Sequence, residues 1–590
     1  MLIMKQNLMI MGLGAACMFA GLPVAMAETT AIVGGVVFDG TGAPAAQKTI
    51  IIRDGLIADV GKNVPVPADA RVIDVHGMAV TPGFYDLHTH WTAAGEPSDF
   101  PSIAAAYLRS GVTTVNDFNE APEAYAPLRA WLAKLDAPHV NFAARISTPG
   151  GHGADWADQN TTRWISSPES AKAAIDGVAA YHPDLIKIFS DGWRYNRMPD
   201  DTSINEATLT AAVAEAHAKG LRVMTHTVTV ERGLIAARAR VDALAHGLQD
   251  RVLTDAETGI IHDSGMGDVP TLSVYDPDKW IKSSAHKIVA NSVLFDNALR
   301  NVGKLFRAGV VIGVGTDAGM PATPHGISTL HELELLVRAG LTPAQALVAA
   351  THSSAVLIGQ DHDRGLIEAG MRADITVFEG RPWEKISDIH HVAMTMVDGK
   401  PLYGLGAPSE DARSGWPAPL PAAKLVDDFE RMDGRSSLDT LRTNTMDRGP
   451  DRTVEVSGTM PRESGKGHVL FMTAVMAQQK APYAGVSVPL STGAVLAVDV
   501  SAYHGISVEV RGSSCNARMT ANGTVGASWA ASFPLTGYWQ TVRVPFSSFT
   551  GLDNPPRRAW TGRDITDMEI GLSCAPGTTA WLQADNLRFY

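Results

Sequence analysis

The chain has 590 residues, a hydrophobic content of 45%, a charged content of 19% and a formal net charge of −13. This length exceeds that of one ordinary domain, and the composition is that of a folded soluble protein, so two or three domains are expected. The acidic balance, with no basic run to override it, excludes nucleic acid as the main partner.

Residues 1–27 have the features of a secretory signal. Lys5 supplies the positive start, an apolar run follows over residues 8–20, and Ala25-Met26-Ala27 is a small-x-small cleavage site. A membrane anchor is the alternative, but the run is short for a span, and no later stretch is long and apolar enough to cross a membrane. We therefore expect a periplasmic or secreted protein with no integral membrane segment after signal cleavage.

The cysteines that follow the signal predict a disulfide. If cleavage follows Ala27, only Cys515 and Cys574 remain in the chain. Two cysteines in an exported chain favour one disulfide, so we predict that these two pair. The alternative is two unpaired buried thiols.

Strand-like runs separated by turns flank the centre of the chain. In the first flank, alternating apolar runs end in Asp39-Gly40 and Asp54-Gly55, dipeptides typical of tight turns. A similar passage returns in the second flank. The simplest account is one small β-sandwich built from residues 28–81 and 365–403, with another domain, residues 82–364, inserted between its two parts.

Strand-like and helical patterns alternate in the inserted domain, and residues 207–219 are one of the helical patterns. Eight apolar, β-rich runs occur, at residues 84–90, 112–118, 140–146, 185–189, 222–227, 243–247, 270–274 and 310–315. Eight βα units over this length predict a closed parallel barrel, the (βα)8 TIM barrel. The alternative is an open doubly wound sheet, but no Gly-rich phosphate loop follows the first strand.

The last part of the chain changes character. Residues 404–423 contain Pro, Gly and Ser and are predicted to be a linker. Residues 424–590 are strand-rich, with no long helical pattern, which favours a β-sandwich of the jelly-roll type. The predicted fold is thus α/β, with a TIM barrel inserted in a small β-sandwich and followed by a C-terminal all-β jelly-roll sandwich.

Potential metal ligands stand at the carboxyl ends of the predicted barrel strands, where such barrels place their ligand and catalytic residues. His88 and His90 end the first strand two residues apart, so both imidazoles point to the same side. The later strand ends carry Lys187, His226, His246 and Asp317. Each of these alone is more simply explained as a structural residue, but the six together indicate one shared metal centre.

A lysine among metal ligands is unexpected, because an ammonium group repels a cation. It fits if Lys187 reacts with carbon dioxide to form a carbamate, N6-carboxylysine, which is negatively charged and has two oxygens to bridge two ions. The apolar run over residues 185–189 would help to deprotonate the amine for this reaction. The alternative is a lysine whose amine caps the barrel mouth.

This pattern resembles the amidohydrolase superfamily in its binuclear, carboxylated-lysine form. The sequence is similar to the imidazolonepropionase-like and prolidase-like branch, which shows Gly-Gly-His-Gly after strand three. The residues that carry the resemblance are Thr81-Pro82-Gly83, His88-Thr89-His90, Gly150-Gly151-His152-Gly153, Lys187, Thr225-His226-Thr227, Ala245-His246-Gly247 and Gly315-Thr316-Asp317-Ala318-Gly319.

The resemblance implies a ligand set and a mechanism. A hydroxide between two ions would attack the substrate carbonyl, with Asp317 as general base and then general acid. A metal, together with His152, would polarise the carbonyl. Zinc is expected from the nitrogen-rich ligands, and manganese or cobalt would also fit. One metal would be held by His88, His90, the Lys187 carbamate and Asp317, and the second by His226, His246 and the same carbamate.

The loop after Lys187 departs from the small, glycine-rich form expected of the family. Its Trp193, Arg194, Tyr195 and Arg197 follow strand four and are predicted to overhang the metals and contact substrate. A guanidinium there could hold a substrate carboxylate bidentately. The alternative is a pair of solvated surface arginines.

The C-terminal region, residues 424–590, resembles the CIA30-like, galactose-binding-like β-sandwich. A stabilising or positioning domain without a ligand ranks ahead of a weak carbohydrate contact. The matching pieces are Asp427-Asp428-Phe429, Tyr503-His504-Gly505-Ile506, Trp539-Gln540-Thr541-Val542, Pro545-Phe546 and Asp585-Asn586-Leu587-Arg588-Phe589.

These features together predict an exported metal-dependent hydrolase that cleaves a C–N bond of amide or peptide type in a small-molecule substrate. An esterase or lactonase is the alternative enzyme, because the same attacking group reaches either carbonyl. An inactive glycan- or envelope-binding protein is the alternative from another class, and the complete ligand set argues against it. Whether the chain forms a homo-oligomer stays open.

Overall fold

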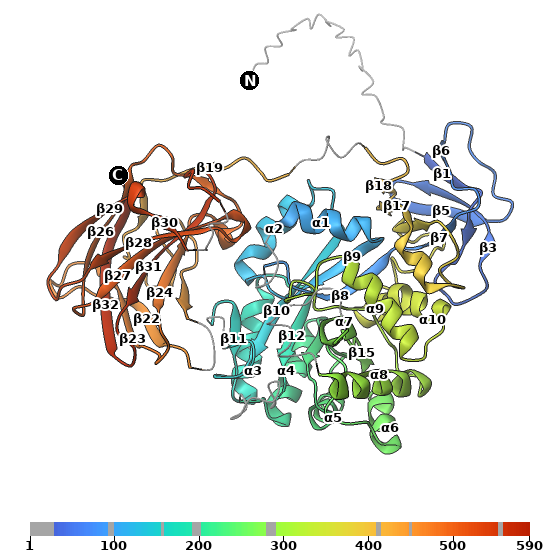
Figure 1. Ribbon diagram of the computed structural model, residues 1–590, viewed down its shortest axis with the longest axis horizontal. Coiled ribbons are helices and arrows are strands. Elements are labelled where there is room, and N and C mark those ends of the chain that lie inside the picture. Colours follow the sequence, from blue (N-terminus) through green and yellow to red (C-terminus); the bar gives the residue numbers. More distant parts are fainter. Residues whose placement is uncertain are drawn as a thin grey trace, which may run out of the picture.

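The computed structural model describes residues 29–92, 99–154, 159–191, 202–278, 291–408, 415–447, 451–552 and 558–590. Figure 1 shows three units: a small β unit that contains the first strands, a central α/β unit and a C-terminal β unit. The predicted signal at residues 1–27 lies outside the described residues. None of the helices in the described part of the chain has the length and apolar character of a membrane span.

The two flanks of the chain meet in the small β unit. β7 (Ala79–Pro82) pairs antiparallel with β16 (Ile375–Phe378). Both belong to a six-stranded sheet in the order β18-β17-β16-β7-β2-β3, which shares one apolar core with a four-stranded sheet in the order β5-β4-β1-β6. The remaining bounds are β1 (Thr29–Val33), β2 (Val36–Val37), β3 (Ala46–Gln47), β4 (Thr49–Arg53), β5 (Leu56–Gly61), β6 (Arg71–Asp74), β17 (Val392–Val397) and β18 (Lys400–Gly404).

A curled parallel sheet forms the centre of the α/β unit. Its strands are buried on both faces, which explains why they appear in the sequence as nearly continuous apolar runs. Neighbouring strands follow one another along the chain, and β11 (Thr162–Trp164) pairs beside this path. In order, they are β8 (Phe84–Thr89), β9 (Val112–Asp117), β10 (His139–Ser147), β12 (Leu185–Phe189), β13 (Arg222–His226), β14 (Ala243–Leu244) and β15 (Gly267–Asp268).

The eighth predicted strand, residues 310–315, is an irregular segment in the structure. Ile312 forms an isolated parallel bridge with Asp268 of β15. On the other side, the backbone N–H of Leu87 in β8 donates to the carbonyl of Val314 over 2.8 Å. The segment is therefore hydrogen-bonded to both edges of the curled sheet and lies next to the first strand.

The seventh predicted strand, residues 270–274, is wrong in position. β15 ends at Asp268, and Leu272–Tyr275 instead form the short helix α7. Pro270 has no N–H to give to a strand ladder. The Glu332 carboxylate accepts hydrogen bonds from the first N–H groups of α7, which favours the helical turn.

Helices cover the outer face of the curled sheet, as Figure 1 shows. Helix starts agree with local capping: the Asn205 side chain accepts from the N–H of Thr208 at the start of α4, which the 207–219 pattern predicted. The bounds are α1 (Phe100–Arg109), α2 (Tyr125–Leu132), α3 (Pro168–Ala179), α4 (Glu206–Ala218), α5 (Val230–Arg238), α6 (Asp255–Ser264), α8 (Ser292–Arg307), α9 (Ile327–Arg338), α10 (Pro343–Val348) and α11 (Ser354–Leu357).

The C-terminal unit consists of two antiparallel-rich sheets around one apolar core. Its first strand, β19 (Leu420–Pro421), already pairs with β25 within the region predicted as linker. The larger bounds are β22 (Val454–Pro461), β23 (His468–Val475), β24 (Ala484–Pro489), β26 (Gly505–Gly512), β27 (Asn516–Gly523), β28 (Ser528–Pro534), β29 (Gln540–Pro545), β31 (Ile565–Ser573) and β32 (Thr579–Phe589); the shorter strands are β20 (Leu425–Asp427), β21 (Thr443–Met446), β25 (Val498–Asp499) and β30 (Thr550–Gly551).

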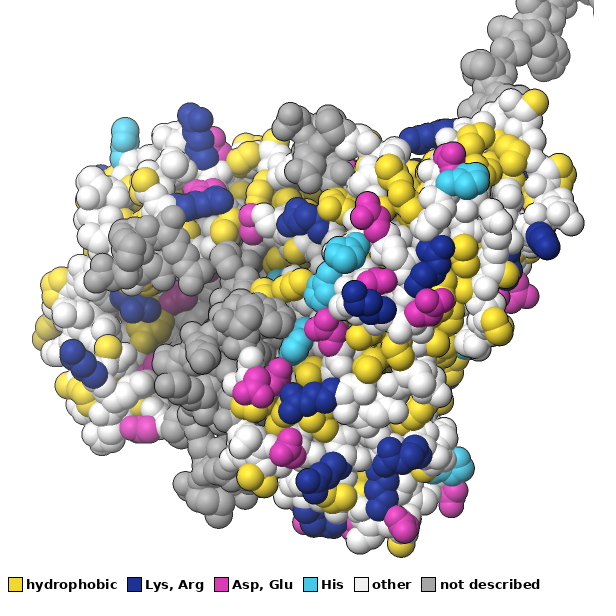
Figure 2. Space-filling model, turned by 45° about the vertical axis from the view of Figure 1, so that its right-hand side comes forward, with side chains coloured by type: hydrophobic (Ala, Val, Ile, Leu, Met, Phe, Trp, Pro, Cys, Tyr) yellow, Lys and Arg dark blue, Asp and Glu magenta, His cyan; other side chains and the backbone are white. Residues whose placement is uncertain are grey.

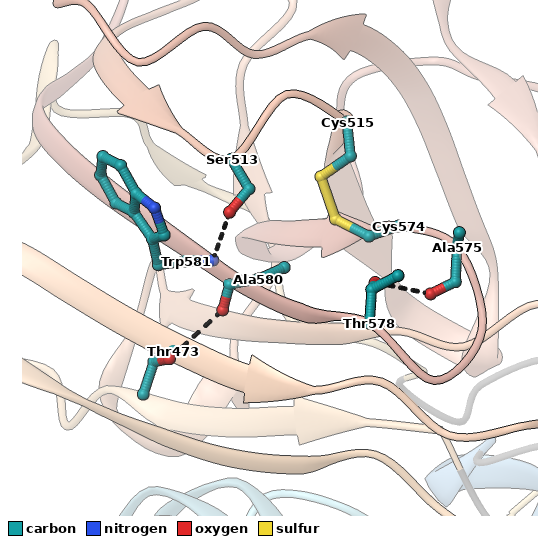
Figure 3. The surroundings of a disulfide bond; sticks show 8 residues. All are labelled: Thr473, Ser513, Cys515, Cys574, Ala575, Thr578, Ala580 and Trp581. Atoms are coloured by element: carbon teal, nitrogen blue, oxygen red, sulfur yellow. Dashed lines mark hydrogen bonds between the residues drawn. A yellow bond between two sulfur atoms is a disulfide. The ribbon is translucent and has the colours of Figure 1, made fainter.

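Cys515 and Cys574 form the predicted disulfide, with 5.3 Å between their Cα atoms. Cys515 precedes β27 and Cys574 follows β31, and these two strands pair antiparallel up to this end. Figure 3 shows the bond near the turn in which the Thr578 hydroxyl donates to the carbonyl of Ala575. The disulfide therefore closes one end of a paired strand ladder.

Polar contacts join the C-terminal unit to the central unit. Arg435 forms an ion pair with Glu123, which lies just before α2. The Asn160 side chain donates to the carbonyl of Arg442 over 3.0 Å, and Arg452 donates to the carbonyl of Ala154 over 2.9 Å. On the face drawn in Figure 2, acidic and basic side chains are interspersed, with no large patch of one sign among the described residues.

Candidate metal centre

One group of potential ligands forms where β8 meets the irregular eighth segment. Nε2 of His90 lies 2.8 Å from Oδ1 of Asp317, and Nε2 of His88 lies 3.3 Å from the same oxygen. Two backbone hydrogen bonds of 2.8 Å fix this register: the N–H of Asp317 donates to the carbonyl of His88, and the N–H of His90 donates to the carbonyl of Ala318. Three predicted ligands therefore converge.

A buried carboxylate stabilises the contact between β8 and the eighth segment. Asp86 accepts hydrogen bonds from the backbone N–H and the hydroxyl of Thr316, at 3.0 and 2.7 Å, and from the hydroxyl of Thr329 at 2.8 Å. It thus ties β8 to the eighth segment and to α9. Burial raises the pKa of Asp86 to about 7, although these hydrogen bonds favour its ionised form.

Lys187 lies deep in the same centre, on β12. Its side chain is fully buried, with Nζ 3.3 Å from Nε2 of His88 and 4.5 Å from the ring centroid of Phe118. Burial lowers the pKa of Lys187 to about 7, against the attraction of Asp317 and Asp191. A substantial fraction of the amine is therefore neutral and nucleophilic near neutral pH.

A second group of potential ligands combines His152, Asp191 and His226. Nε2 of His226 lies 3.2 Å from Oδ2 of Asp191, and Nδ1 of His152 lies 3.7 Å from that oxygen. The two imidazole rings stack with their centroids 4.2 Å apart. Asp191 was not among the predicted site residues, although its position two residues after the end of β12 was an available signal.

His246 lies between the two groups. Its ring centroid is 4.2 Å from that of His226 and 4.6 Å from that of His88. Its Nδ1 is 2.6 Å from the hydroxyl oxygen of Thr271. Hydrogen bonds of this kind on the far ring nitrogen orient metal-binding histidines in proteins.

The chemistry of these donors suits divalent metal ions. In each group, one ligand atom per residue lies within 4.8 Å of the others, and all of these side chains are buried. Burial and neighbouring positive groups lower the pKa of His88 and of His246 well below the ordinary value, so these imidazoles are neutral and have lone pairs to donate. Neutral imidazoles with carboxylates are typical ligands of zinc.

A third group, His139, Asp374 and Asp398, lies between the central and small β units and has a different character. Nη1 of Arg372 donates to Asp398 over 2.7 Å, and Nε2 of His139 lies 3.2 Å from Asp374. The contact of His139 with Asp374 joins the two units, whereas Arg372 and Asp398 both belong to the small β unit. The group plays no part in the centre at the carboxyl ends of the strands.

The predicted substrate-contacting residues Trp193, Arg194, Tyr195 and Arg197 lie outside the described residues. His152, by contrast, lies inside the second group, and its backbone carbonyl accepts a 2.6 Å hydrogen bond from the Ser147 hydroxyl at the end of β10.

Comparison with known families agrees with this geometry. A family model described as the amidohydrolase family matches residues 79–402, more than half of the chain.

The chain belongs to the amidohydrolase family.

Individual relatives within this family are distant. Imidazolonepropionase from Deinococcus deserti is 25% identical over 360 residues, which cover 57% of this chain and 87% of that protein. Ochratoxinase from Aspergillus niger is 26% identical over 440 residues, which cover 66% of this chain and 90% of that protein. The solved structure of a candidate prolidase from Bifidobacterium longum has a TM-score of 0.55 and 26% identity, covering 65% of this chain and 97% of that chain.

The amidohydrolase match identifies the chain as an enzyme, and the family typically depends on metal ions. It begins at β7 and ends within β18, so it contains the whole curled sheet and both ligand groups. The C-terminal β unit follows the matched region.

Proposed function

We propose that this amidohydrolase is an exported, metal-dependent enzyme that cleaves a C–N bond of amide or peptide type in a small molecule. The observation that carries the proposal is the pair of buried ligand groups at the carboxyl ends of the strands, with Lys187 next to His88 and His246 between the two groups. Export rests on the signal features of residues 1–27 and on the disulfide in the C-terminal unit.

Two divalent ions fit the proposal, zinc first and manganese or cobalt next, and when bound they would polarise the scissile carbonyl and make water a better nucleophile at neutral pH. One ion would be held by His88, His90, Asp317 and the modified Lys187. The other would be held by His226, His246 and the modified Lys187, with Asp191 as a further available ligand because of its distance of 3.2 Å from His226.

Asp317 performs the proton transfers in this proposal. Burial opposes ionisation of its carboxyl, but the hydrogen bond with His90 and the nearby positive groups lower its pKa below the ordinary value. The carboxylate is therefore available to accept a proton from the attacking water and to pass it to the leaving nitrogen as the C–N bond breaks. His152, on the opposite side of the centre, would donate a hydrogen bond to the carbonyl oxygen.

Lys187 would act after carboxylation to N6-carboxylysine. Its neutral amine attacks carbon dioxide, a nitrogen–carbon bond forms, and one proton leaves, so the product has one negative charge and two oxygens. The buried, apolar surroundings that lower the pKa of Lys187 to about 7 support this reaction. In the same proposal, the irregular eighth segment completes a closed barrel, and the C-terminal unit is a CIA30-like, galactose-binding-like jelly roll.

Paired substitutions at the centre test the proposal. Lys187→Ala should lower both the bound metal per chain and the rate of hydrolysis, and short carboxylic acids should restore part of the rate. Asp317→Asn retains an oxygen near the metal but cannot accept a proton. It should keep more metal than Lys187→Ala while its turnover falls by roughly a hundredfold or more.

Elemental analysis and a screen of dipeptides, N-acyl amino acids and esters provide the measurements. Two metals and near-normal turnover in Lys187→Ala would contradict the bridging carbamate and favour a one-metal site of His88, His90, His226 and Asp317. Cleavage of esters but not of amides would replace the C–N hydrolase with an esterase or lactonase.

A further inference from the structure

A cleft of about 550 Å³ separates the central unit from the C-terminal unit. Its lining includes Thr92, two residues after the predicted ligand His90, and Glu120, which follows the end of β9. The side-chain amide of Asn119 donates to the Thr92 hydroxyl over 2.8 Å and joins these two loops. The cleft therefore lies between two units, and the loops that follow β8 and β9 contribute to its lining.

Aromatic rings form one wall of the cleft. Trp131 of α2 lies 5.3 Å from Phe100 of α1 and 4.8 Å from Trp416, measured between ring centroids. The indole N–H of Trp416 donates to Asp99 over 3.1 Å, which fixes that ring against the central unit. Trp416 belongs to the segment that connects the two units. This aromatic wall therefore forms only when that segment packs against the central unit.

A buried carboxyl forms the floor of the cleft. Glu120 is only 8% exposed, and its Oε1 has no hydrogen-bond partner among the described residues. Burial and the neighbouring Asp117 carboxylate raise the pKa of Glu120 to about 8, although Thr92 and the charge of Arg145 favour its ionised form. A positive group in the cleft would relieve this unfavourable arrangement.

The C-terminal unit supplies the opposite wall through two strained turns. Val525 has φ 60° and Ala494 has φ 57°, left-handed conformations that these residues rarely adopt. The adjoining polar groups are held in place, because the Asn522 amide donates to Asp567 over 2.8 Å and the Ser528 hydroxyl donates to Asn522 over 2.7 Å. Strained conformations of this kind persist where the surroundings hold a binding surface in place.

We propose that this cleft is a binding site for a cationic amine attached to a planar apolar group, and that it holds the part of the substrate farthest from the bond being cleaved. The second part of this statement rests on the proposed hydrolase function. A cation would lie over the aromatic faces and donate to the Glu120 carboxylate, while the apolar group would pack against Trp131 and Trp416.

The charges around the cleft distinguish a cation from other ligands. Glu120 and Asp567 line it, the Asp117 carboxylate interacts electrostatically with Glu120, and the described lining residues include no lysine or arginine. A carboxylate ligand would therefore meet two lining carboxyl groups and no lining lysine or arginine among the described residues. A neutral ligand would gain the aromatic contact but would leave the buried Oε1 atom of Glu120 without a charged donor.

Three related probes test the binding site without any need for hydrolysis. We expect the mature full-length protein to bind 2-phenylethylammonium at least tenfold more tightly than 2-phenylethanol, and 3-phenylpropionate more weakly still, measured by calorimetry. Glu120→Gln should abolish the preference for the ammonium over the alcohol. Trp416→Ala should weaken both. Glu231→Gln, on the exposed surface of α5, is the matched control and should behave as wild type.

Equal binding of the three probes by the wild-type protein would overturn the cleft proposal, as would an unchanged ammonium preference in a folded Glu120→Gln variant. The wild-type comparison needs no variant, so a folding defect in a variant does not remove the test.

Kinetics then connect the cleft to the reaction. For a peptide-type substrate that the enzyme cleaves, a lysine-containing version should have at least a tenfold higher kcat/KM than its norleucine counterpart, mainly through KM. Glu120→Gln should remove this difference, and the surface control Glu231→Gln should retain it. Amine binding in the cleft without any C–N hydrolysis would refute the proposed function but support the binding site, and hydrolysis without lysine preference would refute the substrate role of the cleft.

Discussion

At the scale of single residues, Thr271 is the supporting residue that orients His246. It has φ 48°, a left-handed conformation that is rare for a β-branched residue. The strained backbone places its hydroxyl oxygen 2.6 Å from Nδ1 of His246. When Nδ1–H donates to this oxygen, Nε2 of the neutral ring has a lone pair for a metal ion.

Thr271→Val should therefore weaken metal binding by about 10- to 100-fold, the usual effect of losing such a support. Valine has nearly the same shape but no hydroxyl, so the fold should persist. Competition with a chelator measures the affinity. Thr271→Ser retains the hydroxyl and should hold metal nearly as well as wild type; equal affinity in the valine variant would show that Thr271 does not support the ligand.

At the scale of secondary-structure elements, α9 fixes the short helix α7 beside the centre. Glu332 of α9 accepts hydrogen bonds from the N–H groups of Leu272 and Ser273, at 2.8 and 2.6 Å. Nε2 of His331 lies 2.8 Å from Oδ2 of Asp276, which follows α7 directly. Since α7 begins next to Thr271, α9 supports the environment of His246 through two polar contacts.

The ion pair of His331 predicts a pH dependence of stability. Burial lowers the pKa of His331, but hydrogen bonds to Asp276 and Glu334 outweigh burial and raise it to about 9. The folded-state pKa lies above the unfolded value of about 6.5, so the stabilisation is complete below pH 6.5 and is lost as the pH rises through 9. His331→Gln should reduce the free energy of unfolding by about 2 kcal/mol at pH 6.

The same substitution should cost little at pH 9.5, and denaturant unfolding at both pH values measures the difference. His262→Gln, on the exposed side of α6, controls for the loss of an imidazole. A stability loss for His331→Gln that is the same at pH 6 and pH 9.5 would show that the ion pair does not account for the effect.

At the scale of the whole molecule, the C-terminal unit contains a disulfide cross-link and packs against the central unit. The Cys515–Cys574 disulfide closes a loop with a sequence separation of 59 residues. A cross-link of this length restricts the unfolded chain and commonly contributes about 2 to 5 kcal/mol. The Arg435–Glu123 ion pair and the Trp416 packing attach this unit to α1 and α2.

The mature protein, unfolded without reductant, should therefore show neither Cys515 nor Cys574 as a titratable thiol. The double variant Cys515→Ser, Cys574→Ser should lower the unfolding free energy of the C-terminal unit by about 2 to 5 kcal/mol. Two free thiols in the non-reduced protein would contradict the cross-link. Addition of reductant to the double variant is the control, since it should have no further effect.

Local sequence patterns are sufficient for much of this architecture. Most strands of the curled sheet fall where apolar β-rich runs predict them, and α4 follows its predicted pattern within one residue at each end. His88 and His90 could be identified because residues two apart on a strand face the same side, and because parallel strands present their carboxyl ends together. Strand alternation and the shared edge of parallel strands depend only on neighbouring residues or on one repeating geometry, so they can be predicted from the sequence.

Other features depend on contacts between distant parts of the chain. Glu332 helps to make residues 272–275 a helix, although the local apolar pattern favours a strand. Asp191 joins His152 and His226 only because three strand ends meet. The cleft requires α1 and α2 to face turns of the C-terminal unit more than 350 residues later in the sequence. Local sequence periodicity does not predict such contacts. The free energy that selects them comes from packing and electrostatics between segments that are brought together only by folding.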